Sequence, residues 1–257
     1  MITIDKLCYH SKLRYCNAAE KFAFSVLTIL FCVVSRSAVI AGIVLLTTGI
    51  LTVWKGGIPF LRYLKFLTVP LVFLILSTLA IIVNFSESPM DLFAIPLGNW
   101  YLTGSLHSLI YAGRLILTAL SSVSCLYFLS LNTPMTDILS VLDRLHCPKL
   151  IMELMLLIYR FIFLLMEIAS AITTAQNSRL GIKDFRTSCR SFSAMASALF
   201  LRAIRKSSIL YDAMESRCYN GTIRVLTEQF PPRKAEIFAI ILFELLLLLL
   251  TVYLYFH

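Results

Sequence analysis

The chain has 257 residues, of which 59% are hydrophobic and only 14% are charged, and its formal net charge is +9. Soluble domains average about 45–50% apolar and about 25% charged residues, so this composition excludes a soluble globular domain, a disordered chain and a disulfide-rich secreted scaffold. The apolar residues form long unbroken runs and do not alternate, which argues against an outer-membrane barrel. The sequence predicts an all-α integral membrane protein with several spans.

Five apolar runs are candidates for membrane-spanning helices. A helix needs about 20 apolar residues to cross a hydrocarbon core of about 30 Å. We expect spans at about 20–34, 38–54, 64–84, 108–131 and 235–257. The first two are short and are separated only by Ser35-Arg36-Ser37, so they are predicted to form a tight helical pair.

The basic residues between these runs predict the orientation. Residues 1–21 and 54–65 carry several Lys and Arg, residues 85–107 carry none, and residues 176–234 carry eleven. Basic segments near spans stay on the cytoplasmic side of the membrane. We therefore expect a multi-pass protein of a bacterial or archaeal cell membrane, with its N-terminus in the cytoplasm and five crossings.

The apolar stretch 150–166 is ambiguous. A sixth crossing there would place the most basic segment of the chain outside the cell. The same helix carries Glu153, Arg160 and Glu167 on one face, at a spacing of seven residues, and three ionisable groups cost several kcal/mol in a lipid-embedded span. We therefore interpret 150–176 as a very hydrophobic amphipathic helix on the cytoplasmic side, with a sixth span as the alternative.

This interpretation divides the chain into an N-terminal membrane part at 1–131, a cytoplasmic domain at 132–234 and a last span at 235–257. A short amphipathic helix opens the cytoplasmic domain, and long ones follow at 150–176 and 193–217. These helices are too apolar to stand alone in water. They are therefore expected to dock on another surface.

Nucleotide-binding and catalytic motifs are absent from the sequence, and few charged residues lie deep in the predicted spans. The sequence has no P-loop, no zinc-protease motif and no serine-hydrolase motif. Arg114 in the fourth span and Glu244 in the last are the intramembrane candidates for function, although such an Arg can also reach the interface or a neighbouring helix end. A carrier that bound a cation in the bilayer would need more acidic or His ligands. We therefore expect no catalytic residues, no metal site, and no substrate held by this chain alone.

Two short stretches near the ends of the long cytoplasmic helices share a pattern. They are Ser178-Arg179-Leu180-Gly181 and Ser216-Arg217-Cys218-Tyr219-Asn220-Gly221. Arg favours the negative end of the helix dipole, and its guanidinium can bind a carboxylate in a partner's groove through two hydrogen bonds. One copy would be typical of ordinary helix capping. Its recurrence on two successive helices favours docking on a partner.

Around these motifs the chain resembles a known family. The segments YRFIFLLMEIASAITTAQNSR and SALFLRAIRKSSILYDAMESRCYNG, with the upstream LNTPMTDILSVLDRL and LTGSLHSLIYAGRLIL, follow that family's pattern and order. The family is the transmembrane T-component of energy-coupling factor (ECF) transporters, and the cobalt-type, CbiQ-like branch is the most similar. The resemblance runs from about residue 17 to 221 and is strongest over 142–221.

The resemblance implies a non-catalytic membrane scaffold. Its two Arg motifs would dock on a pair of ABC-type ATPases, which bind the ATP and Mg, so this chain would need no cofactor. No nucleic-acid partner is expected either, because no basic patch of the sequence is interleaved with stacking aromatic residues. Other surfaces of its coupling helices would hold a membrane-embedded S-component that binds Co²⁺ or Ni²⁺. The family's motifs are usually Ala-Arg-Gly-like, whereas here the following Gly is displaced to Gly181 and Gly221.

Other functions stay open at this stage. The chain could serve an ECF transporter for a vitamin, because substrate choice would belong to the S-component. It could also be a self-sufficient carrier or an intramembrane enzyme, although Arg114 and Glu244 make a poor set of reactive groups. A membrane scaffold without a transport function would leave the repeated motif unexplained.

Overall fold

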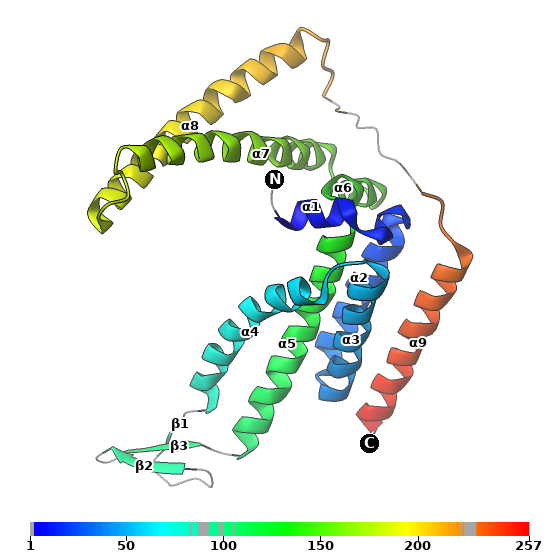
Figure 1. Ribbon diagram of the computed structural model, residues 1–257. Coiled ribbons are helices and arrows are strands. Elements are labelled where there is room, and N and C mark those ends of the chain that lie inside the picture. Colours follow the sequence, from blue (N-terminus) through cyan, green and yellow to red (C-terminus); the bar gives the residue numbers. More distant parts are fainter. Residues whose placement is uncertain are drawn as a thin grey trace. The chain divides into compact units, whose positions relative to one another are not determined.

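The computed structural model describes residues 3–82, 84–86, 93–97, 100–104, 106–221, 223 and 230–256 (Figure 1). The chain divides into two units. We call residues 2–138 with 228–257 the bundle unit, and residues 139–227 the arm unit. Helix α6 (Met135–Arg144) runs across the boundary. The three-part division at 1–131, 132–234 and 235–257 stays a prediction.

The bundle unit contains the five predicted spans as helices. They are α2 (Ala18–Ser35), α3 (Ala38–Ile50, continued by a π-helical turn at Leu51–Lys55), α4 (Phe60–Ile82), α5 (Leu106–Asn132) and α9 (Lys234–Phe256). A short α1 (Thr3–His10) and a 3₁₀ turn (Lys12–Tyr15) precede them. The protein is therefore an all-α membrane protein, as predicted, and α5 packs against α2, α3 and α4.

A small antiparallel sheet joins α4 to α5, which the sequence analysis did not predict. Its strands are β1 (Asn84–Ser86), β2 (Phe93–Leu97) and β3 (Trp100–Gly104), in the order β1-β3-β2. Leu97 pairs with Trp100, and Gly98-Asn99 between them is a two-residue hairpin signal. This region was interpreted only as an acidic loop, because its strands are too short for a clear alternation pattern.

Hydroxyl groups join the bundle helices in the interior. The Ser124 hydroxyl of α5 lies 2.6 Å from both the Thr48 hydroxyl of α3 and the Tyr63 hydroxyl of α4. Near the start of α2, the Lys21 ammonium donates to the backbone carbonyls of Leu13 and Asn132, each at 3.0 Å. These polar side chains are buried, and buried hydrogen bonds of this kind fix the register of packed helices.

The arm unit consists of two long helices that pack against each other, α7 (Lys149–Ser178) and α8 (Phe185–Glu215). Helix α8 begins eight residues before the predicted 193–217. Asp184 is its N-cap and has an extended backbone (φ −126°, ψ 157°), so the helix starts at the residue that follows. The polar Arg186 and Arg190 masked this start in the sequence. By length and composition alone α7 is a sixth candidate span, so the choice between five and six crossings rests on the charge distribution.

Candidate functional site

The C-terminus of α7 presents the first Arg motif. Arg179 follows the last helical residue, and the next residue, Leu180, has a left-handed backbone with φ of 56°. The N–H of Gly181 donates to the Gln176 carbonyl at 2.8 Å, and the N–H of Leu180 donates to the Asn177 carbonyl at 3.1 Å. This pair of bonds around a left-handed residue is the Schellman motif, which satisfies the last carbonyls of a helix.

The C-terminus of α8 presents the second Arg motif with the same backbone. Here Cys218, directly after Arg217, is left-handed with φ of 58°. The N–H of Tyr219 donates to the Met214 carbonyl at 3.1 Å, and the N–H of Cys218 donates to the Glu215 carbonyl at 2.9 Å. The two motifs are thus equivalent helix ends, each with Arg immediately before the left-handed residue.

The structure shows where the left-handed residue of each motif lies relative to the displaced glycine. The left-handed turn lies directly after each Arg, at Leu180 and Cys218, where an Ala-Arg-Gly motif would place its glycine. Gly181 is needed for another reason, since a Cβ there would lie 2.9 Å from the Gln176 carbonyl oxygen and 2.9 Å from the Ser191 hydroxyl. Of the two motif glycines, Gly221 is itself left-handed, with φ of 85°.

Replacing the left-handed residues with glycine should stabilise the arm unit. Leu180→Gly and Cys218→Gly are each expected to raise the free energy of unfolding by about 1 kcal/mol, because a left-handed side chain costs about 1–2 kcal/mol. Gly221→Ala, which puts a Cβ on a left-handed residue in open space, should have the opposite sign. Thermal unfolding in detergent measures all three, and a lower melting temperature for the two glycine variants would contradict this geometry.

In each motif the serine bonds to its own helix, whereas the arginine does not form an ion pair within the described part of the chain. The Ser178 hydroxyl donates to the Thr174 carbonyl at 3.1 Å, and the Ser216 hydroxyl donates to the Ala213 carbonyl at 3.0 Å. Both serine hydroxyls therefore bond back to a carbonyl of their own helix. Arg179 and Arg217 are exposed, and neither forms an ion pair with any residue that the structure describes. Their guanidinium groups are open to a partner.

Each Arg-bearing end is attached to the other helix of the pair. At the first end, the Gln176 amide donates to the Ser191 carbonyl and the Ser191 hydroxyl donates to the Gly181 carbonyl, both at 2.8 Å. At the second end, the Glu153 carboxylate of α7 accepts the Tyr219 hydroxyl at 2.5 Å and the Ile223 N–H at 3.0 Å. The two arginines are thus held on one hydrogen-bonded helical pair.

The sequence analysis did not identify these positioning residues. Glu153 was grouped with Arg160 and Glu167 in one charged stripe, but Glu153 is buried while the other two are exposed. The odd environment of Glu153, a carboxylate in an apolar run, was the available signal. Its partner Tyr219 lies 66 residues further along the chain, too far for any local pattern.

Tyr219→Phe should loosen the second Arg end without unfolding the helices. The Glu153 carboxylate accepts a hydrogen bond from the Tyr219 hydroxyl, and this bond raises the pKa of Tyr219 above its ordinary value. The bond is therefore intact at neutral pH and is lost only as the pH rises through that raised pKa. Amide exchange over residues 214–221 should become faster in the variant. Tyr211→Phe, at an exposed tyrosine of α8, is the matched control, and equal exchange in both variants would contradict the role of Tyr219.

Arg114 and Glu244 do not form a common site. Arg114 lies two turns into α5 and is exposed. Glu244 of α9 is buried, and its Oε1 lies 2.7 Å from the Thr28 hydroxyl of α2, which names the partner that the sequence could not. Its Oε2 has no hydrogen-bond partner among the described residues. Glu244 therefore joins α9 to α2, whereas Arg114 faces away from the interior.

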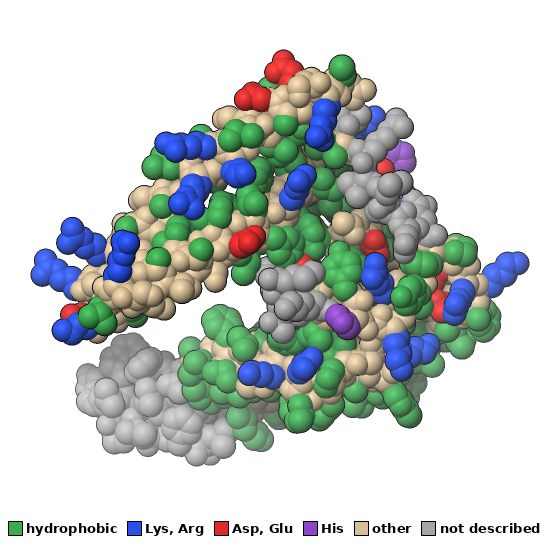
Figure 2. All heavy atoms as spheres, turned by 45° about the horizontal axis from the view of Figure 1, so that its top comes forward, with side chains coloured by type: hydrophobic (Ala, Val, Ile, Leu, Met, Phe, Trp, Pro, Cys, Tyr) green, Lys and Arg blue, Asp and Glu red, His purple; other side chains and the backbone are tan. Residues whose placement is uncertain are grey.

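Basic and hydrophobic side chains alternate over the visible face of the arm unit (Figure 2). Large apolar side chains along both helices are exposed, among them Leu150, Ile158, Phe185, Phe192 and Phe200. Exposed apolar side chains in this number, interspersed with basic ones, are typical of an interaction surface for a protein or a membrane.

Comparison with known proteins gives consistent matches. A family model described as cobalt transport protein, CbiQ, matches residues 10–229. Uncharacterized protein MJ1089 of Methanocaldococcus jannaschii is 32% identical over 252 residues, which is 96% of this chain and 92% of that protein. Cobalt transport protein CbiQ of Salmonella typhimurium is 28% identical over 222 residues, 86% of this chain and 98% of its own. A putative fused cobalt transport protein CbiMQ of Methanocorpusculum labreanum is 31% identical over 246 residues, 93% of this chain and 40% of the fused protein.

Proposed function

The chain belongs to the CbiQ family of cobalt transport proteins, and we propose that it is the non-catalytic energy-coupling subunit of an ECF-type importer. In this function it links ATP hydrolysis in a pair of ABC-type ATPases to reorientation of a membrane-embedded S-component. The S-component binds the substrate, Co²⁺ or Ni²⁺. ATP and Mg are bound by the ATPases, not by this chain.

One observation carries the proposal: the two arginines stand on equivalent helix ends. Arg179 and Arg217 share the same Schellman backbone, are exposed, and have no ion-pair partner within the described chain. An exposed guanidinium at a fixed helix end suits a carboxylate-containing groove, because it forms two parallel charge-assisted hydrogen bonds. Two equivalent ends suit two equivalent or similar grooves, one on each ATPase.

The exposed apolar faces of α7 and α8 support a second partner. Side chains such as Phe192 and Phe200 are about two-thirds exposed (65% and 66%), which is costly unless a partner or lipid covers them. We assign this surface to the S-component. The relative from Methanocorpusculum labreanum, a putative fused cobalt transport protein named CbiMQ, supports a function beside a second component.

The main alternative is a self-sufficient Co²⁺ carrier, and reconstitution separates the two. The purified chain alone in proteoliposomes is expected to transport no Co²⁺. Uptake should appear only when the ATPases, the S-component and internal ATP are added. Uptake by the chain alone would overturn the proposal and return attention to the buried Glu244.

A further inference from the structure

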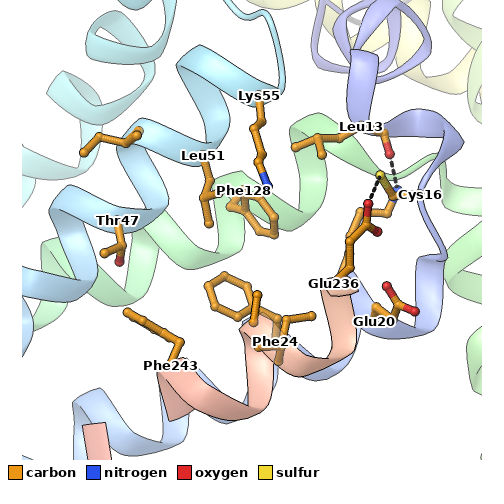
Figure 3. Close-up of a pocket in the computed structure, with 14 residues that line it drawn as sticks. Leu13, Cys16, Glu20, Phe24, Thr47, Leu51, Lys55, Phe128, Glu236 and Phe243 are labelled. Atoms are coloured by element: carbon orange, nitrogen blue, oxygen red, sulfur yellow. Dashed lines mark hydrogen bonds between the residues drawn. The ribbon is translucent and has the colours of Figure 1, made fainter. Parts of the chain in front are cut away.

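A cavity of about 470 Å³ lies inside the bundle unit, and no residue of the two Arg motifs lines it (Figure 3). Its walls come from α2, from α3 with its π-helical turn, from α5 and from α9. Most of the lining is apolar, with aromatic rings from Phe24, Phe128 and Phe243. Ligand sites in proteins have volumes of about 300–1,000 Å³, so the cavity is large enough for part of a ligand.

The cavity has a charged end and an apolar end, and their depths differ. Glu20 lies in the first turn of α2, Glu236 in the first turn of α9, and Lys55 at the last residue of the π-helical turn. These three positions are the ends of candidate spans, so they lie at one membrane–water interface. Phe24 and Phe243 lie one to two helical turns deeper. A ligand aligned with the cavity is polar at the interface and apolar in the hydrocarbon.

The charged end contains an unsatisfied acceptor and a nearby cation. Glu20 accepts the backbone N–H of Arg233, but its Oε1 is buried without a hydrogen-bond partner. Glu236 lies 3.7 Å from the exposed Arg233 guanidinium. From another wall Lys55 extends into the cavity (Figure 3). The Glu20 carboxylate, which also interacts with Glu236 and whose Oε1 is unpartnered, and the exposed Lys55 ammonium thus line one cavity.

We propose that this cavity binds a phospholipid with a zwitterionic amine headgroup, of the phosphatidylethanolamine class. The headgroup ammonium donates to Glu20, the phosphate pairs with Lys55, and an acyl chain lies along Phe24 and Phe243. Lys21 is not available to the phosphate in the same way, because its ammonium already donates to two backbone carbonyls. A metal ion is not the ligand, since no three His, Cys, Asp or Glu side chains converge on one point in the described chain.

The charge pattern favours this lipid over an anionic one. An anionic headgroup such as phosphatidylglycerol would also meet Lys55, but it has no ammonium for Glu20 and would bring a second negative charge beside two carboxylates. Like charges repel one another more strongly where the dielectric constant is low. The site should therefore bind a lipid with an amine headgroup more tightly than an anionic lipid.

Native mass spectrometry of the detergent-purified chain, titrated with palmitoyl-oleoyl phosphatidylethanolamine or phosphatidylglycerol, tests the proposal. The amine lipid is expected to bind the wild type about tenfold more tightly than the anionic lipid, the value of one charge-assisted hydrogen bond. Glu20→Gln should remove this preference, and Ile240→Trp, which fills the cavity, should weaken both lipids. Glu167→Gln, at an exposed carboxylate of α7, is the matched control and should leave both affinities unchanged.

Two results would overturn the lipid site. One is equal binding of both lipids by the wild type, and the other is an unchanged preference in Glu20→Gln. If Glu20→Gln does not fold, as judged by gel filtration, Lys55→Gln takes its place and should weaken both lipids through the lost phosphate contact, whereas unchanged affinity would count against the site. None of these outcomes depends on the ATPases, so the result stands apart from the proposed function.

Discussion

Charge reversal at both arginines, Arg179→Glu with Arg217→Glu, is expected to abolish retention of the ATPases during co-purification and to abolish Co²⁺ uptake. The reason is that each guanidinium would enter a groove containing a carboxylate, and reversal replaces an attractive pair with a repulsive one. Removing one partner of a buried charge pair costs about 2–5 kcal/mol. Two such losses should weaken binding by more than about 100-fold.

The double variant needs a control with the same change of charge. Arg202→Glu with Arg205→Glu provides it, because both arginines are exposed in the middle of α8 and lie away from the two helix ends. This control should retain the ATPases. Both variants should keep the wild-type gel-filtration profile and helical circular dichroism. Equal retention in the two variants would show that the Arg motifs are ordinary helix caps.

Gly56→Ala is expected to cause the largest loss of stability, about 3 kcal/mol, and a large fall in melting temperature. A Cβ at Gly56 would lie 2.4 Å from the Thr52 carbonyl oxygen and 2.5 Å from the Asn132 amide oxygen. The Asn132 oxygen cannot move freely, because it accepts the Ser11 hydroxyl at 2.6 Å. Backbone would have to shift where the 3₁₀ turn, the π-helical turn and α5 meet.

Gly113→Ala is the matched control for this steric argument. No atom lies within 4 Å of a Cβ at Gly113, which sits inside α5. Ala is a better helix former than Gly by about 1 kcal/mol, so this variant should melt at or above the wild-type temperature. Thermal unfolding in detergent, followed by circular dichroism, measures both. A Gly56→Ala protein that melts like the wild type would contradict the packing described around Asn132.

The five bundle helices could be predicted from the length of their apolar runs, whereas α7 is equally long and apolar and was set apart only by its charges. Each of the five predicted runs is a helix whose ends lie within a few residues of the expected ones. Pro70 within α4 did not mislead, since the apolar run continues past it and the membrane favours an internally hydrogen-bonded helix. The start of α8 was missed because its first turns are polar and carry no apolar periodicity.

The Arg positions were visible in the sequence, but their geometry was not. Glycine is the residue that normally marks a left-handed helix end, so Leu180 and Cys218 gave no signal, and the glycines that follow drew attention instead. The contacts that hold the ends in place are non-local, with Gln176 bonded to Ser191 and Glu153 bonded to Tyr219. Such pairings depend on how α7 and α8 pack, which no local pattern encodes.

The cavity in the bundle unit was equally invisible. Cys16, Glu20 and Glu236 lie at the start of two helices far apart in the sequence, and the thiol of Cys16 comes within 3.7 Å of the Glu236 carboxylate only in the folded chain. In the sequence these residues resemble the polar residues that ordinarily flank a membrane span. Only the packing of α9 against α2 brings them to one pocket.

The coupling function requires both Arg-bearing ends to lie in the cytoplasm, where ATPases can reach them, and labelling of Cys189 tests this placement most directly. Cys189 is exposed on α8 between the two arginines, and replacing Cys16, Cys147 and Cys218 with Ser leaves it the only cysteine that is not buried in the described chain.

A membrane-impermeant maleimide should label Cys189 in inverted vesicles and not in intact cells, whereas an introduced Glu87→Cys should label from outside. This result requires five crossings and a cytoplasmic α7. Labelling of Cys189 from outside intact cells would make α7 a sixth span, place both arginines outside, and contradict the coupling function.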